Sequence, residues 1–76
     1  MKTFNQIVSE HLKIVESEVK DSLTMQDVPG WDSMNFLLLI ADFEKEFGVS
    51  FSMDEVLSVN SLGAIRALLQ KKGLNV

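Results

Sequence analysis

The sequence predicts an all-α fold, a small four-helix bundle with three longer helices and one short third helix. Apolar residues recur every three or four positions in three long segments, as they do on one face of an α-helix. Residues that start and stop helices flank these segments. Strand-like alternation is limited to "GVSFSM" at residues 48–53 and has no partner segment. With 76 residues, of which 46% are apolar, the chain is expected to form one domain over residues 1–76.

The first helix is predicted over residues 3–20. Thr3 and Gln6 have the spacing of a capping box at its start. His11 lies within the apolar face and is expected to be a boundary residue bonded to backbone or solvent, without a functional role. The apolar face comprises Phe4, Ile7, Val8, Leu12, Ile14, Val15 and Val19.

Residues 21–31 break this pattern and predict a long ordered loop. Its apolar residues Leu23, Met25 and Val28 are expected to anchor it to the core, and Pro29-Gly30 marks a turn before the next helix. Loops of this length in compact domains tend to be functional or to act as linkers.

The second helix is predicted over residues 32–48, with Asp32 as its N-cap and Gly48 as its stop. Its helical projection has one core stripe, a polar face of Asn35, Asp42 and Glu46, and a second apolar stripe. The core stripe comprises Phe36, Leu39, Ile40, Phe43 and Phe47, and the second stripe comprises Met34, Leu37, Leu38 and Ala41. A helix in a small bundle is expected to bury only one stripe.

The second stripe has two interpretations. It packs beneath the long loop or against the third helix, an outcome left open for Leu37 and Ala41. Alternatively, part of it stays exposed as a docking patch, which we favour for Met34 and Leu38 because methionine suits surfaces that bind several partners.

Residues 49–59 are expected to contain the short third helix, with Ser52 and Glu55 as a second capping box. Residues 60–73 predict the fourth helix, capped by Asn60 and closed by Lys71, Lys72 and Gly73.

Composition excludes several classes of function. The net charge of −4 disfavours a nucleic-acid binder and suits partners with basic surfaces. The absence of cysteine excludes disulfides and thiolate metal sites, and no D-x-D-x-D-G calcium loop is present. The longest apolar run, "FLLLIA", is too short to span a bilayer, and the N-terminus lacks a signal peptide. A cytoplasmic monomer is therefore expected.

Ser33, in "GWDSM" at residues 30–34, is the most prominent candidate site. A serine nucleophile needs a nearby base and an oxyanion hole, and His11, the single histidine, lies on another helix. No G-x-S-x-G elbow is present. Ser33 is thus no catalytic residue by itself, but its hydroxyl at a helix N-terminus suits modification by another enzyme, and that helix end favours an attached phosphate.

The motif "GWDSM" resembles the G-x-D-S-L/M signature of acyl carrier proteins. The resemblance extends over roughly residues 4–72, including "DFEKEFGVSF" at 42–51 and "NSLGAIRALL" at 60–69. It implies a carrier, and no enzyme, in which Ser33 receives 4′-phosphopantetheine from coenzyme A through a Mg²⁺-dependent phosphopantetheinyl transferase. The thiol of that group then carries an acyl or aminoacyl group as a thioester.

The resemblance also implies partners. Besides the transferase, these are an acyl- or aminoacyl-loading ligase and a downstream acyltransferase or synthase. Asp32 matches the aspartate that supports the helix start and the transferase encounter. The residues expected to bind partners are Met34, Leu37, Leu38, Glu44, Asp54 and Glu55.

Asn35 and Leu38 depart from the family, which usually has acidic residues at these positions. We therefore expect weaker electrostatic steering and a specialised carrier, in lipid or secondary-metabolite biosynthesis, that does not serve general fatty-acid synthesis. Trp31 is expected either to pack on the loop and core or to contact the prosthetic arm. The alternative function is an unmodified acidic interaction module that docks partners through Met34, Leu37 and Leu38.

Overall fold

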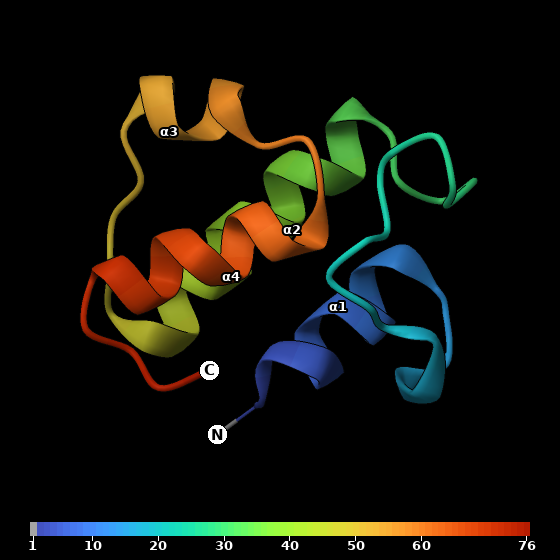
Figure 1. The fold of residues 1–76 in the computed structure, drawn as a ribbon, viewed down its shortest axis with the longest axis horizontal. Helices are drawn as coiled ribbons and strands as arrows, with labels where there is room; N and C mark the ends of the chain where they lie inside the picture. The colour runs from blue at the N-terminus through green and yellow to red at the C-terminus, as the bar shows by residue number, and fades with distance from the viewer. Residues whose placement is uncertain (1) are drawn as a thin grey trace.

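The computed structural model describes residues 2–76, so Met1 of the predicted domain lies outside the described residues. It contains four α-helices, α1 (Phe4–Leu12), α2 (Ser33–Phe47), α3 (Met53–Ser58) and α4 (Leu62–Lys71), and a short 3₁₀ helix, η1 (Glu16–Glu18). No strand occurs among these residues. The all-α prediction with a short third helix is confirmed. Figure 1 shows α3 at one edge of the bundle and the loop before α2 on the opposite side.

The core is formed by α1, α2 and α4, together with two residues of the loop. Phe4 of α1 stacks on Phe43 of α2 with ring centroids 5.1 Å apart, and Phe47 also stacks with Phe43, with centroids 6.0 Å apart. The buried apolar residues of the cluster are Phe4, Ile7, Val8, Leu12, Val28, Trp31, Leu39, Phe43, Leu62, Ile65 and Leu69. The short helix α3 contributes no buried residue.

The first helix is shorter than predicted. It begins at the expected capping box of Thr3 and Gln6 but ends at Leu12, because Lys13 adopts the left-handed conformation with φ 58°. The Ser9 hydroxyl donates a hydrogen bond to the Ile14 carbonyl at 2.6 Å, which closes this end. Ile14 and Val19 still pack against the core from the loop, so their apolar character did not require a helix. Val15 is exposed.

The loop before α2 is anchored at fewer apolar residues than predicted. Val28 is buried and Leu23 packs partly against the core, but Met25 is exposed. Backbone hydrogen bonds attach the loop to the start of α4: the amides of Leu62 and Gly63 donate to the carbonyls of Leu23 and Asp21 at 3.0 and 2.9 Å. Ser61 caps α4, one residue later than the predicted Asn60.

Asp42 was predicted on a polar, solvated face of the second helix, and this prediction is wrong. Its carboxylate lies between α1 and α2, where His11 Nε2 is 2.8 Å and Lys2 Nζ 3.3 Å from Oδ2. Partial burial acts to raise the pKa of Asp42, but the hydrogen bonds from His11 and Lys2 outweigh it and hold that pKa below its ordinary value. His11 is a boundary residue as expected, but its partner is the Asp42 carboxylate and not the expected backbone or solvent.

Candidate functional site

The start of α2 presents Ser33 to solvent. Asp32 is the N-cap, with an extended backbone, and its Oδ1 accepts a hydrogen bond from the Asn35 amide at 2.8 Å. Ser33 is the first residue of the helix and is exposed, as are Asp32 and Met34. The carboxylate of Asp32 satisfies one of the free N–H groups of the first turn and suits the positive end of the helix dipole.

The segment that leads into Ser33 is held closely against the core. Val28 and Trp31 are each 3% exposed, and the Trp31 amide donates to the Val28 carbonyl at 3.0 Å. Trp31 therefore packs on the loop and core, beside Phe36 with ring centroids 6.2 Å apart. The Asn35 side chain donates from Nδ2 to the Gly30 carbonyl at 2.7 Å. No local pattern in the sequence predicts this bond.

All four residues of the second stripe on α2 are exposed. Met34 is 68%, Leu37 59% and Leu38 49% exposed, and Ala41 is also exposed. The exposure that we favoured for Met34 and Leu38 is confirmed, and Leu37 and Ala41, for which the outcome was left open, are exposed as well. A helix with a buried stripe and an exposed apolar stripe offers a surface for another molecule. We call Met34, Leu37, Leu38 and Ala41 the outer stripe.

Two further exposed apolar residues lie on α3 and were not predicted from the sequence. Met53 is 70% and Leu57 75% exposed. They stand four positions apart in a six-residue helix, and this spacing places them on one face. An apolar pair on a helix too short to bury it was the signal in the sequence.

The predicted acidic partner residues differ in their availability. Glu44 accepts a hydrogen bond from the Phe51 amide at 2.8 Å, which fixes the turn after α2. Glu55 forms a capping box with Ser52 and an ion pair with Lys72 at 3.0 Å, and the Ser52 amide followed by Lys72 lowers the pKa of Glu55. Asp54 is exposed. The structure thus gives Glu44 and Glu55 internal partners and leaves Asp54 towards solvent.

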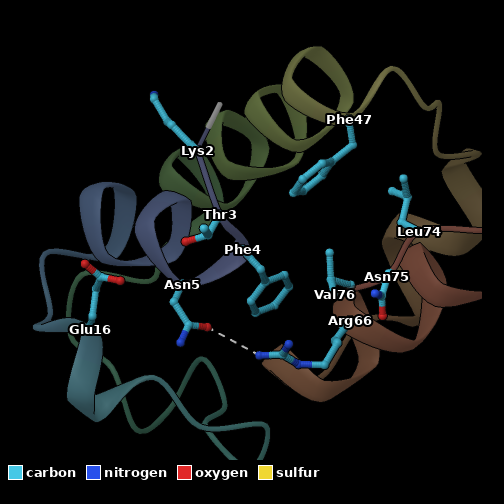
Figure 2. Close-up of a pocket in the computed structure, with 10 residues that line it drawn as sticks. All are labelled: Lys2, Thr3, Phe4, Asn5, Glu16, Phe47, Arg66, Leu74, Asn75 and Val76. Carbon is cyan, nitrogen blue, oxygen red and sulfur yellow. Dashed lines mark hydrogen bonds between the residues drawn. The ribbon is translucent and has the colours of Figure 1, made fainter.

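A cavity of about 610 Å³ lies at the other end of α2 (Figure 2). Its apolar walls include Phe4, Phe47 and Leu74, and Arg66 lies at its edge with its guanidinium carbon 4.2 Å from the centre of the Phe4 ring. Arg66 is engaged by Asp21 at 2.9 Å and by Asn5 at 3.4 Å. Phe47 ends α2 and Ser33 begins it, so about 21 Å of helix separates the cavity from the serine.

Residues 2–76 contain neither of two other kinds of site. No three side chains of His, Asp or Glu come together there to hold a metal ion. No helix in this part of the chain has the length and apolar character needed to cross a membrane.

Comparison with known proteins shows which family the whole chain resembles. A family model described as "Phosphopantetheine attachment site" matches residues 2–69. An acyl carrier protein of Thermotoga maritima is 35% identical over 66 residues, which cover 87% of this chain and 82% of the relative. A solved structure from Mycobacterium tuberculosis, assigned as an acyl carrier protein, superposes with a TM-score of 0.80 over 91% of this chain and 92% of that one. Its sequence identity is 19%, so this match shows the fold.

Proposed function

The chain belongs to the acyl carrier protein family, whose members hold covalent 4′-phosphopantetheine, and we propose that Ser33 is the residue that receives it. One observation carries this assignment: an exposed serine hydroxyl is the first residue of α2, directly after the Asp32 cap. The matched region, residues 2–69, includes this position.

The proposed modification is a phosphoryl-type transfer. The Ser33 oxygen forms a bond to the phosphorus next to pantetheine in coenzyme A. The bond between that phosphorus and the bridging pyrophosphate oxygen breaks, and adenosine 3′,5′-bisphosphate leaves. The transferase must supply the base that accepts the serine proton, because His11 lies on α1 and is bonded to Asp42.

The residues around Ser33 fit an attached phosphodiester. The first N–H groups of a helix have no partner within the helix. Among them, the Asn35 amide donates to the Asp32 carboxylate. The amides of Ser33 and Met34 therefore remain beside the modified oxygen, at the positive end of α2. When bound, the group supplies a thiol, which this cysteine-free chain lacks, and that thiol would carry the acyl or aminoacyl group as a thioester.

Partner enzymes would dock through apolar contacts more than through charge. The outer stripe supports this proposal because its residues are exposed and begin at Met34, directly after Ser33. Among the acidic residues expected to bind partners, Asp54 is exposed, whereas the Glu44 and Glu55 carboxylates already have internal partners. The ion pair with Lys72 offsets the charge of Glu55, which weakens the steering of basic partners. We therefore propose a specialised carrier with a dedicated loading enzyme and acceptor.

The test is intact mass after incubation with coenzyme A, Mg²⁺ and a promiscuous phosphopantetheinyl transferase. Wild-type protein should gain one phosphopantetheine, and Ser33→Ala should gain none. A gain in both would place the attachment elsewhere. No gain in wild type, under conditions that modify a control carrier, would favour the unmodified interaction module that docks partners through Met34, Leu37 and Leu38.

The specialised role has its own test. The gene should fail to complement a strain that lacks its housekeeping acyl carrier, although its product is fully modified in that strain. Normal growth would show a general carrier. The cytoplasmic location and the monomeric state remain predictions from the sequence.

A further inference from the structure

Asn35 makes a contact that only a hydrogen-bond donor can make. Its Nδ2 lies 2.7 Å from the Gly30 carbonyl oxygen, and its own backbone amide is capped by Asp32 at 2.8 Å. An aspartate at this position would present only acceptor oxygens to that carbonyl. The amide side chain therefore joins the last residues of the loop to the first turn of α2.

The carbonyl that Asn35 holds belongs to a closely packed turn. A β-carbon at Gly30 would lie 2.7 Å from the Leu12 carbonyl oxygen, so the turn rests directly on the end of α1 and needs glycine there. Trp31 follows, buried, and its indole Nε1 has no hydrogen-bond partner among residues 2–76. Burying an N–H donor without a hydrogen-bond partner costs free energy, so this group opposes the burial of the Trp31 ring. The turn thus depends on its other contacts, of which the Asn35 bond lies nearest to Ser33.

We propose that Asn35 is a positioning residue for the modification of Ser33, an inference that rests on the proposed function. By fixing Gly30 and Trp31 to the first turn, its side chain keeps Asp32 in the cap and holds the Ser33 hydroxyl in the one orientation that the transferase meets. Loss of the bond frees residues 30–32 and lowers the fraction of protein that presents Ser33 correctly. A lower competent fraction raises the apparent dissociation constant and leaves the bound complex unchanged.

The experiment compares Asn35→Ala and Asn35→Asp with wild type, in transferase kinetics and in the free protein. KM for the carrier should rise in Asn35→Ala by at most about fivefold, because one net hydrogen bond changes the equilibrium between competent and incompetent states by about that factor. It should rise further in Asn35→Asp, and kcat should be unchanged in both variants. In the free variants, the Phe36 amide, which bonds to the Asp32 carbonyl, should exchange hydrogen faster. The fluorescence of Trp31, the single tryptophan, should shift to the red. Asn60→Asp, an exposed change of equal charge before α4, should match wild type throughout.

Each result decides between roles. A raised KM with unchanged exchange and fluorescence in the free protein would mean that Asn35 touches the transferase, and the positioning role would be wrong. Wild-type KM in both variants would also overturn it, and would leave the assignment of Ser33 intact. If wild type gained no phosphopantetheine at Ser33, the proposed function would fail and this proposal with it.

Discussion

The two apolar faces of α2 are similar in composition and opposite in environment. Leu39, Ile40 and Phe43 lie within the protein, and Phe43 stacks with the rings of Phe4 and Phe47. The outer stripe of Met34, Leu37, Leu38 and Ala41 lies on the other side of α2 and is exposed. Folding accounts for the first face through the burial of apolar area. It does not account for the second, which stays in contact with solvent.

The largest effect should come from truncating the inner face. Phe43→Ala should lower the free energy of unfolding by about 3–5 kcal/mol, since it removes the central ring of the aromatic stack and leaves a cavity. Leu37→Ala, on the opposite face, should change it by less than about 0.5 kcal/mol, as is usual for exposed positions. Urea unfolding followed by circular dichroism measures both. A large loss in Leu37→Ala would show that the outer stripe packs within the protein after all.

A smaller effect, on function alone, should come from the outer face. Met34→Ser and Leu38→Ser should each lower kcat/KM for modification by a phosphopantetheinyl transferase by about five- to tenfold, as truncation of well-placed interface residues does. Their melting temperatures should stay at the wild-type value because both side chains are exposed.

The matched control for this prediction is Met25→Ser. Met25 is also exposed and apolar, but it lies on the loop before α2. Its substitution should leave kcat/KM unchanged. Equal losses of kcat/KM in Met25→Ser and Met34→Ser would indicate that exposed methionines act through nonspecific hydrophobic contact. The outer stripe would then have no specific role in docking.

Local signals in the sequence predicted the helix ends of α2 and the exposed serine. Asp32 and Gly48 act through their own backbone geometry, and each is recognisable from its residue type. The double apolar pattern predicted the outer stripe for the same reason, since the angle around a helix follows from spacing alone.

Such local signals could not predict contacts between segments that are far apart in the sequence. The periodicity of residues 3–20 indicated a longer helix because Ile14 and Val19 reach the core equally well from a loop. Nothing near Asp42 indicates that His11 and Lys2, more than thirty residues earlier, would surround it. The Asn35 bond to Gly30 spans five residues, but it depends on a turn whose shape is set by the end of α1.

The smallest effect should come from the polar contact between α1 and α2, and it should appear as a pH dependence of the free energy of unfolding. The pKa of Asp42 is lower in the folded protein than its unfolded value, near 3.8. Ionised Asp42 therefore stabilises the fold above that unfolded value, and this stabilisation is lost as the pH falls through the folded pKa. Asp42→Asn should therefore be less stable than wild type by about 1 kcal/mol at pH 7, the order of one hydrogen bond. The difference should shrink as the pH falls below about 4, because wild type then protonates Asp42 as well. Urea midpoints at pH 7 and pH 3 measure it, and a difference that stayed constant between them would assign the loss to packing instead of charge.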